Sequence, residues 1–306
     1  MRPVRWDYDQ VLRPRLMQAG SLISAKEAER RVLILENPGL RGKASATHSL
    51  YAGVQLVMPG EVAPAHRHSQ GAVRFIIEGA GGYTAVEGER IPMHPGDFVT
   101  TPGWTWHDHG NDTDAPMVWM DVLDVPLVGL LDAGFSQQSN EDSQTQTIPT
   151  GDSSARFAHN IFPVDWKSGS FASPIYNYPY ARSRETLATM ALNGDPDACH
   201  GYKVRYVNPA NGRHVMPTIG AFMQLLPAGF SSAPYRSTDS GVYTVVEGEG
   251  ETRFGDQVIH WKPRDIFVVP SWALHTHKAS SDAVLFSASD RPVHEALSLW
   301  REERRD

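Results

Sequence analysis

The segment His66-Arg67-His68 carries two imidazole side chains separated by a single residue. Alternate residues of a β-strand point to the same side of the sheet, so a strand through this segment would direct both rings into one cavity. Neutral imidazole is the side chain that most often binds metal ions. The spacing therefore fits a metal site, although an exposed pair or two packed core histidines would show the same pattern.

Glycine and proline residues frame this pair and lead to a further histidine. Gly60 precedes His66, and Gly79 closes the segment. A second block has the spacing G-x5-P-x4-H-x3-N and consists of Gly96, Pro102, His107 and Asn111. Together the two blocks resemble the paired motifs of the cupin superfamily. The resemblance implies a small β-barrel that holds one metal ion through His66, His68 and His107.

Both blocks occur twice, which indicates an internal duplication. Two pairs of segments align in the same order, namely 59–83 with 228–252 and 95–109 with 263–277. In the second copy Tyr235 and Ser237 replace the histidine pair, and only His275 remains. One imidazole cannot hold a divalent ion against water, so the second barrel is predicted to be structural.

The first copy lacks the carboxylate that usually completes a cupin metal site. The common pattern has Glu four residues after the second histidine, and this chain has Ala72 there. Three neutral imidazoles leave the full charge on a divalent ion, which favours anionic oxygen ligands from a substrate. Open positions for a bidentate anion and for dioxygen suit non-haem Fe(II), although the usual facial triad includes a carboxylate. Three histidines and an open position also suit Zn(II).

Arg74 shares the parity of the histidine pair if the strand pairing is continuous, so it is expected to face the barrel interior. An arginine inside a small barrel is costly unless its charge is paired. A substrate carboxylate could pair with it bidentately. The alternative is a structural salt bridge with an acid such as Asp121 or Glu78.

Five longer stretches resemble one family of bicupins. They are ERRVLILENPGL, HRHSQGAVRFIIEG, PGDFVTTPGWTWHDHGN, VNPANGRHVMPT and PAGFSSAPYRSTDSGVYTVVEGEG. From about Trp6 onward the chain is similar to the gentisate 1,2-dioxygenase family, which includes salicylate and 1-hydroxy-2-naphthoate dioxygenases. The resemblance implies a homotetramer and Fe(II)-dependent insertion of both oxygen atoms of O2. Family members usually carry a longer arm before the part that resembles residues 6–20, so subunit contacts and pocket closure are expected to differ.

The resemblance also assigns catalytic and substrate-binding residues. Arg74 matches an arginine that holds the substrate carboxylate, and Arg30 matches a second one, with the adjacent Arg31 as the alternative. His109 matches a histidine near the substrate hydroxyl and is the expected proton acceptor, which makes His109 and Arg74 the predicted catalytic residues. The other predicted substrate-binding residues are Gln55, Tyr51, Gly53 and Asp121. Gln55 could instead satisfy buried backbone groups, and Asp121 could orient a ligand histidine.

Composition and charge exclude several classes of protein. The chain has 306 residues, with 28 Lys plus Arg against 35 Asp plus Glu, and a formal net charge of −7. Such a chain lacks the basic face that nucleic acids and anionic membranes require. Cys199 is the only cysteine, which excludes internal disulfides and iron–sulfur clusters. No apolar stretch of signal-peptide or membrane-spanning length occurs, so a cytoplasmic protein is expected.

Short apolar segments separated by turn residues predict an antiparallel β-sandwich or β-barrel in each half. The resemblance to the cupins implies an all-β bicupin, that is, two tandem antiparallel β-barrels of the double-stranded β-helix type. Strands are predicted at 51–58, 72–79, 97–102 and 117–123. A capping box at Ser24 and Glu27 predicts a helix to about Arg31, and residues 292–303 have the pattern of an amphipathic C-terminal helix. The expected divisions are an N-terminal helical segment (1–40), the metal-binding barrel (41–135), a linker (136–170) that begins with an exposed mobile stretch (136–147), and the second barrel with its C-terminal helix (171–306).

The leading functional hypothesis is an Fe(II)-dependent dioxygenase that cleaves the ring of an ortho-hydroxy aromatic acid between the carboxyl-bearing and hydroxyl-bearing carbons. Gentisate, opened to maleylpyruvate, is the first candidate substrate, followed by salicylate and 1-hydroxy-2-naphthoate. The expected partners are this small acid, O2 and further copies of the chain. The alternatives are a non-catalytic bicupin that binds a small carboxylate and a zinc hydrolase.

Overall fold

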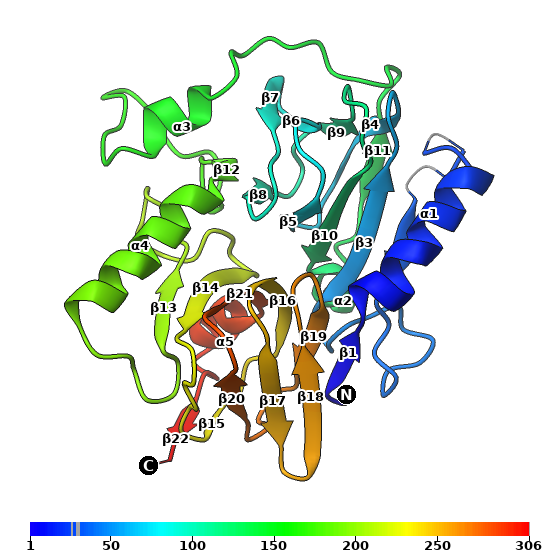
Figure 1. Cartoon of the computed structure of the whole chain (residues 1–306). Coiled ribbons are helices and arrows are strands. Elements are labelled where there is room, and N and C mark those ends of the chain that lie inside the picture. Colours follow the sequence, from blue (N-terminus) through cyan, green and yellow to red (C-terminus); the bar gives the residue numbers. More distant parts are fainter. Residues whose placement is uncertain (26, 29–30, 306) are drawn as a thin grey trace.

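The chain forms two β-barrels, one after the other. The computed structural model describes residues 1–25, 27–28 and 31–305. Figure 1 shows the first barrel above the second, with the N-terminal segment beside both. One sheet of the first barrel has the order β12 (Asn177–Tyr178), β8 (Phe98–Thr101), β5 (Ala72–Glu78), β10 (Met117–Leu123), β3 (Tyr51–Val57) and β2 (Val32–Ile34). The other has the order β11 (Ser136–Gln138), β4 (Val62–His68), β9 (His107–Gly110), β6 (Tyr83–Val86) and β7 (Glu89–Pro92).

The second barrel repeats this plan with three sheets. The largest has the order β1 (Val4–Trp6), β19 (Ile266–Val269), β16 (Gly241–Glu247), β21 (Ala283–Ser289), β14 (Gly220–Leu226) and β13 (Tyr202–Arg205). The others are β18 (Gln257–Trp261), β17 (Gly250–Phe254) and β20 (Thr276–Ala279), and the pair β15 (Tyr235–Ser237) and β22 (Glu302–Arg304). Every strand pair in these sheets is antiparallel, as predicted.

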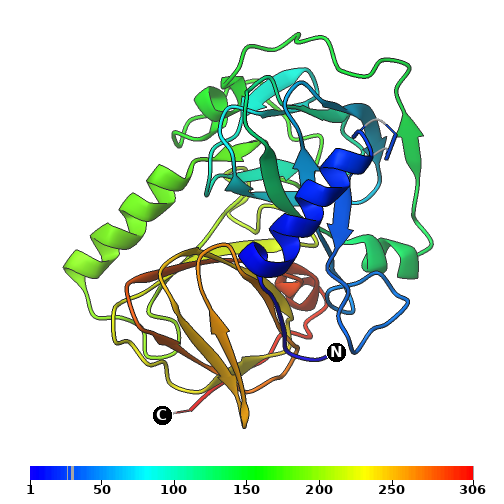
Figure 2. The same ribbon diagram turned by 45° about the vertical axis from the view of Figure 1, so that its right-hand side comes forward.

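Helices lie outside the barrels. They are the π-helix η1 (Tyr8–Leu12), α1 (Arg13–Leu22), α2 (Val125–Leu130), α3 (Asp152–Phe157), α4 (Tyr180–Asn193) and α5 (Arg291–Ala296). Figure 2 shows α1 lying along the first barrel, and its Leu16 is completely buried. The sequence analysis missed α1 and α4, because Leu16 is the one buried residue of α1 and only Ser183 and Leu187 are buried in α4, so neither helix shows a wide apolar stripe.

Backbone geometry supports the duplication that the sequence predicts. Paired glycines adopt the same left-handed conformation, with φ of 76° at Gly60 and 77° at Gly229. The paired tryptophans, Trp104 and Trp272, also have positive φ, at 64° and 58°. A tryptophan rarely adopts this conformation, so its recurrence at both positions reflects one inherited turn.

A single hydrophobic cluster joins the two barrels. It contains Phe75 of β5 and Phe286 of β21, whose rings stack with centroids 4.4 Å apart. The cluster also contains Tyr8 and Leu16 from the N-terminal segment. The barrels and this segment therefore share one core, and that core fixes the strands of the first barrel in place.

The predicted helix from Ser24 to about Arg31 is wrong for the residues that can be examined. The capping box forms, with Ser24 Oγ donating to Glu27 Oε2 at 2.7 Å, but the described residues 24, 25, 27 and 28 make a turn. Residues 26, 29 and 30 lie outside the described residues. Immediately after Arg31 the chain enters β2, whose pairing with β3 requires an extended backbone.

The C-terminal helix is shorter than predicted. It ends at Ala296 rather than near residue 303, and Ser298 has a positive φ of 58°. The following residues form β22, where Glu303 lies opposite Arg236 of β15 and accepts a hydrogen bond from its Nε at 2.6 Å. Pairing with β15 thus replaces the last helical turns.

The polar segment at 136–147 is exposed, as expected, but it is not a loose connection. Its first residues form β11, which pairs with β4 in the register Ser136 with His68 and Gln138 with His66. Gln144 further along donates from its backbone N–H to Asp108 Oδ2 at 2.9 Å. The segment therefore adds a strand to the one that carries the histidine pair.

Candidate metal centre and substrate site

Three buried histidines meet inside the first barrel. His66 and His68 lie on β4, and His107 is the first residue of β9, directly opposite His66. An irregularity in the β4–β9 pairing between Ala63 and His66 sets this register. One nitrogen of each ring lies within 4.8 Å of the others, and these residues are the one such group found among the described residues. The structure thus brings the three predicted ligands together.

Hydrogen bonds orient all three rings in the same way. Nδ1 of His66 donates to the Pro64 carbonyl at 2.7 Å, that of His68 to Gln70 at 2.9 Å, and that of His107 to Thr105 at 2.9 Å. A carbonyl oxygen only accepts, so each Nδ1 carries the proton and each Nε2 carries the lone pair. This tautomer is the one that a metal ion bound through Nε2 requires, and the donor set therefore fits a divalent ion.

The strand that carries the pair is supported on both sides. β11 pairs with it along one edge and β9 along the other. The backbone N–H of Trp104 also donates to the His68 carbonyl at 2.6 Å, across the turn where Trp104 has its positive φ. Arg67, between the two histidines, points outward and lies 4.6 Å from the Trp104 ring centroid. Alternation along β4 thus sends the arginine to the surface and both imidazoles inward.

Arg74 is buried beside the three histidines, with 3% of its surface exposed. Its Nε donates to Asp121 Oδ1 at 2.8 Å, and one terminal nitrogen donates to Thr84 Oγ1 at 2.6 Å. The two terminal nitrogens also contact His109 Nδ1 at 3.0 Å and Nε2 at 3.2 Å. Burial lowers the pKa of Arg74, and the charge of Asp121 opposes that effect. The salt bridge to Asp121, which the sequence offered as the alternative to a substrate carboxylate, is therefore present.

His109 completes this cluster. It lies on β9 two residues after His107, and their ring centroids are 5.8 Å apart. Because arginine only donates, the imidazole nitrogen that accepts from Arg74 is unprotonated. His109 is accordingly neutral in this arrangement and can receive a proton.

Strand β3 supplies three more of the predicted site residues. Gly53 lies opposite Asp121 of β10, which lies opposite Arg74 of β5, so the three positions form one row across the sheet. A Cβ at Gly53 would lie 2.5 Å from Val32 Cγ1 and 2.6 Å from Tyr51 Oη, so a larger residue would have to displace these side chains. Gln55 is 2% exposed, and within the described part of the chain its Nε2 has no hydrogen-bond partner. A buried amide in this state is poised for a ligand or water.

Comparison with known proteins identifies the family. The Cupin_2 model, described as a cupin domain, matches residues 53–123 and 221–288. A gentisate 1,2-dioxygenase of Aquipseudomonas alcaligenes is 57% identical over 302 residues, which cover 99% of this chain and 87% of that protein. A 5-aminosalicylate 1,2-dioxygenase of Comamonas is 39% identical, covering 99% and 81%. The crystal structure of a salicylate 1,2-dioxygenase from Pseudaminobacter salicylatoxidans superposes with a TM-score of 0.92 at 36% identity, covering 99% and 88%.

The chain belongs to the gentisate 1,2-dioxygenase family. The predicted family, the bicupin fold and the class of enzyme, a ring-cleaving dioxygenase, are thereby confirmed. The three histidines and this family membership together indicate a metal cofactor. Among the described residues, no helix has the length and apolar character needed to cross a membrane.

The sequence analysis predicted a second arginine that binds the substrate carboxylate, either Arg30 or Arg31 of the N-terminal segment. Arg30 lies outside the described residues. The alternative, Arg31, is 3% exposed and forms an ion pair with Glu61. It also donates to the Ile23 carbonyl at 2.6 Å. Arg31 therefore anchors its own segment to the turn before β4.

Two acids that position the site of this dioxygenase were missed. Glu61 accepts from Arg31, from Met58 N at 2.7 Å and from Ala25 N at 3.1 Å. Burial would raise the pKa of Glu61, but these hydrogen bonds outweigh it and lower the pKa. Glu61 belongs to no sequence motif, and its position next to Gly60 is the one signal in the sequence that could have indicated a role.

The second missed acid, Asp124, connects the two barrels near the histidines. Its Oδ1 accepts from Gly71 N at 3.0 Å, in the loop after His68, and its Oδ2 accepts from Thr218 Oγ1 at 2.5 Å. Burial raises the pKa of Asp124 despite these hydrogen bonds. Asp124 thus ties the loop after the histidine pair to the second barrel.

Proposed function

We propose that this protein is an Fe(II)-dependent dioxygenase that opens gentisate to maleylpyruvate, cutting between the carboxyl-bearing and hydroxyl-bearing ring carbons. The observation that carries the proposal is the group of three oriented histidines with no carboxylate among them. Such a donor set leaves positive charge at the centre and favours a substrate that brings its own anionic oxygens. A carboxylate beside an ortho hydroxyl provides two such oxygens.

His66, His68 and His107 would hold the iron, which supplies the electron transfer to dioxygen when bound. The remaining residues bind the substrate and move protons. Behind β3 and β10, Val54, Leu56, Val118 and Met120 are fully buried in the core shared with the second barrel, which holds these strands in place.

Arg74 and His109 form the proton-handling pair of the proposed mechanism. Asp121, Thr84 and His109 together contact all three nitrogen atoms of the Arg74 guanidinium. We infer that a substrate carboxylate approaching Arg74 displaces one of these partners. We propose that it replaces His109, whose lone pair then receives the proton of the substrate hydroxyl. Asp121 keeps Arg74 in place during this exchange.

The names of the relatives support a choice among the candidate substrates. The relative with 57% identity is named a gentisate dioxygenase, and a protein of Nocardioides with 35% identity is named a 1-hydroxy-2-naphthoate dioxygenase. A structure of the salicylate dioxygenase adduct with gentisate, at 36% identity, has a TM-score of 0.93. These names support gentisate first, with salicylate and 1-hydroxy-2-naphthoate as the other candidates.

The decisive experiment measures oxygen uptake by Fe(II)-reconstituted protein with each of the three acids, while the ultraviolet band of the ring-opened product is followed. Stoichiometric uptake with gentisate, and none in a zinc-loaded sample, is the expected result. Uptake only with another acid would replace gentisate by that acid. Turnover by the zinc-loaded sample would overturn the assignment of Fe(II).

We further propose that the protein is a cytoplasmic homotetramer, in keeping with its family, and that its divisions fall at 1–40, 41–135, 136–170 and 171–306. Sedimentation of the purified chain tests the tetramer. Limited proteolysis tests the divisions, because cleavage would concentrate in the connecting segment 136–170.

A further inference from the structure

The second barrel, which has lost the metal ligands, contains a cavity of about 300 Å³. Its walls come from β13, β14, β15, β16, β19 and β21 and from the segment that carries His275, and they lie in the lower half of the molecule in Figure 1. Phe222, Ser287 and Tyr243 are adjacent in the pairing of β14, β21 and β16, so they form one row on the inner face. The cavity occupies the position that the three-histidine site occupies in the first barrel.

The duplication shows how the residues of this cavity differ from those of the metal site. Tyr235 and Ser237 stand where His66 and His68 stand in the first copy, at the repeat offset of 169 (235 − 66). His275 keeps the ring orientation of His107, since its Nδ1 donates to the Ala273 carbonyl at 2.9 Å. No residue of this barrel belongs to the group of possible metal ligands that was found among residues 1–25, 27–28 and 31–305.

In the second barrel, Lys203 occupies the position that the apolar Val32 occupies in the first. Val32 pairs with Gln55 in the first barrel, and Lys203 pairs with Gln224 in the second. Gln55 and Gln224 are equivalent, because they are separated by the same offset (224 − 55 = 169). Lys203 thus lines the cavity from β13, which is the counterpart of β2 in the first barrel.

Positive charge exceeds negative charge in the lining. Lys203, Arg205 and Arg291 contribute three cations, against one acid, Asp239. Asp239 already accepts hydrogen bonds from Ser289 Oγ at 2.9 Å and Trp300 Nε1 at 3.0 Å.

The cations of the lining differ in how they are paired. Arg291 pairs with Glu295 at 2.7 Å, whereas Lys203 has no ion pair within the part of the chain that the structure describes. Burial lowers the pKa of Lys203 to about 8, so it remains mostly cationic at neutral pH.

The other walls suit a planar apolar body with a polar end. Phe222 and Tyr243 offer two aromatic rings. Burial lowers the pKa of His200 to about 3 and that of His275 to about 4, so both imidazoles are neutral and add no positive charge. A volume of about 300 Å³ lies at the small end of ligand pockets. The cavity is therefore suited to one small anion rather than to a nucleotide or a peptide.

We propose that the cavity of the second barrel binds a small aromatic monocarboxylate, with Lys203 against the carboxylate and Phe222 and Tyr243 against the ring. This site needs no metal, because Lys203 supplies the charge that the metal supplies in the first barrel. It is independent of the proposed function, since binding here involves no turnover. The second copy has kept affinity for an aromatic acid while exchanging a metal ion for an ammonium group.

The test uses 4-bromobenzoate, which lacks the ortho hydroxyl needed for two-point binding to a metal. Crystals of the Fe(II)-loaded protein are soaked with it, and bromine is located by anomalous scattering. A bromine peak in the second barrel, retained in His107→Ala, supports the proposal. A peak confined to the three-histidine site, or no peak in either barrel, overturns it.

Solution binding separates the role of Lys203 from general folding effects. In calorimetric titrations we expect Lys203→Met to raise the Kd for 4-bromobenzoate at least 10-fold, whereas Lys203→Arg stays within about 3-fold of the wild type. The exposed Lys43→Met is the matched control and should bind as the wild type does. Equal affinity in Lys203→Met and the wild type would overturn the role of Lys203, and the crystal result stands even if that variant does not fold.

Discussion

Arg74 and Asp121 face each other across strands β5 and β10, and Arg74 Nε lies 2.8 Å from Asp121 Oδ1. The carboxylate is held from the other side by Trp119, whose Nε1 donates to Asp121 Oδ2 at 2.8 Å. The Arg74 guanidinium also lies 4.8 Å from the Trp119 ring centroid. The pair therefore brings two opposite charges into the barrel and fixes the guanidinium that contacts His109.

Removing one member of this pair leaves a charge unpaired in the barrel. We expect Asp121→Asn to lower the free energy of unfolding by about 3–5 kcal/mol, the usual cost of breaking a buried ion pair. Urea denaturation measures it. The matched control is Asp112→Asn, which removes an exposed partner of Arg90 and should cost at most about 1 kcal/mol. Similar losses in both variants would show that Asp121 does not neutralise Arg74.

The duplication offers a matched pair for testing the metal ligands. We expect His107→Ala to lose metal binding, because two imidazoles hold a divalent ion weakly. His275→Ala changes the equivalent histidine of the second barrel and should keep full metal content. Metal analysis after reconstitution with Fe(II) under anaerobic conditions gives the number bound per chain. Full occupancy in His107→Ala would remove His107 from the ligand set.

Metal removal should also lower thermal stability. A ligand that binds only the folded state stabilises it, by about 2.7 kcal/mol when its concentration is 100 times its Kd. For a chain of 306 residues, each kcal/mol corresponds to roughly 1.5–2 °C in Tm. We therefore expect a chelator to lower the Tm of the metal-loaded protein by several degrees and to leave His107→Ala unchanged. An equal shift in both proteins would mean that the chelator acts elsewhere.

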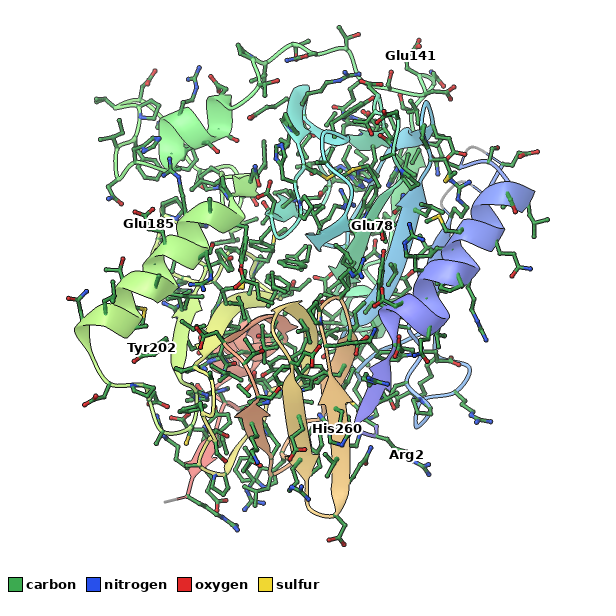
Figure 3. The ribbon with its side chains drawn as sticks, viewed as in Figure 1. Arg2, Glu78, Glu141, Glu185, Tyr202 and His260 are labelled. Atoms are coloured by element: carbon green, nitrogen blue, oxygen red, sulfur yellow. The ribbon has the colours of Figure 1, made fainter. Side chains whose placement is uncertain are left out.

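Glu78 connects the N-terminal segment to the first barrel. Labelled in Figure 3, it accepts from Tyr8 Oη at 2.8 Å and from an Arg13 terminal nitrogen at 2.7 Å. Burial would raise the pKa of Glu78, but these hydrogen bonds and the nearby arginines lower it below its ordinary value of 4.5. The stabilisation from the Glu78 carboxylate is therefore complete above pH 4.5 and is lost as the pH falls through the lowered pKa.

We expect Glu78→Gln to lower the free energy of unfolding by about 1–2 kcal/mol at pH 7. The difference from the wild type should shrink as the pH falls below 4.5, because the wild-type carboxylate is then protonated. Thermal unfolding across this pH range measures both effects. Glu185→Gln, on the exposed face of α4, is the control and should match the wild type throughout. A difference that persists unchanged at low pH would argue against an ionic role for Glu78.

The sequence was most informative where local spacing controls geometry. Alternation along β4 correctly predicted that His66 and His68 share a face, and the predicted strands end within about one residue of β3, β5, β8 and β10. Paired glycines and tryptophans in two aligned blocks revealed the duplication, and each pair adopts the same positive-φ conformation in the structure. Arg74 could be placed inside the barrel by parity, but its partners were left open between substrate and protein.

The rest depends on contacts between residues far apart in the chain. The pairing of Arg31 with Glu61, and of Gly71 with Asp124, follows from tertiary packing and leaves no periodic signal. The predicted helix at 24–31 illustrates the same limit, since a correct cap did not outweigh the pairing of β2 with β3. The roles of Gln55, Tyr51 and Gly53 in substrate binding stay predictions.

The pairing of β1 with β19 has a consequence for how the protein is made. Residues 4–6 of β1 pair with residues 266–268 of β19, so β1 is synthesised long before the strand with which it pairs. Until then it is an unpaired strand, and a chain cut between the barrels leaves β19 with an open edge. Open edges recruit other chains. The two barrels therefore cannot be produced separately without exposing a surface prone to aggregation, and the duplicated halves function as a single inseparable unit.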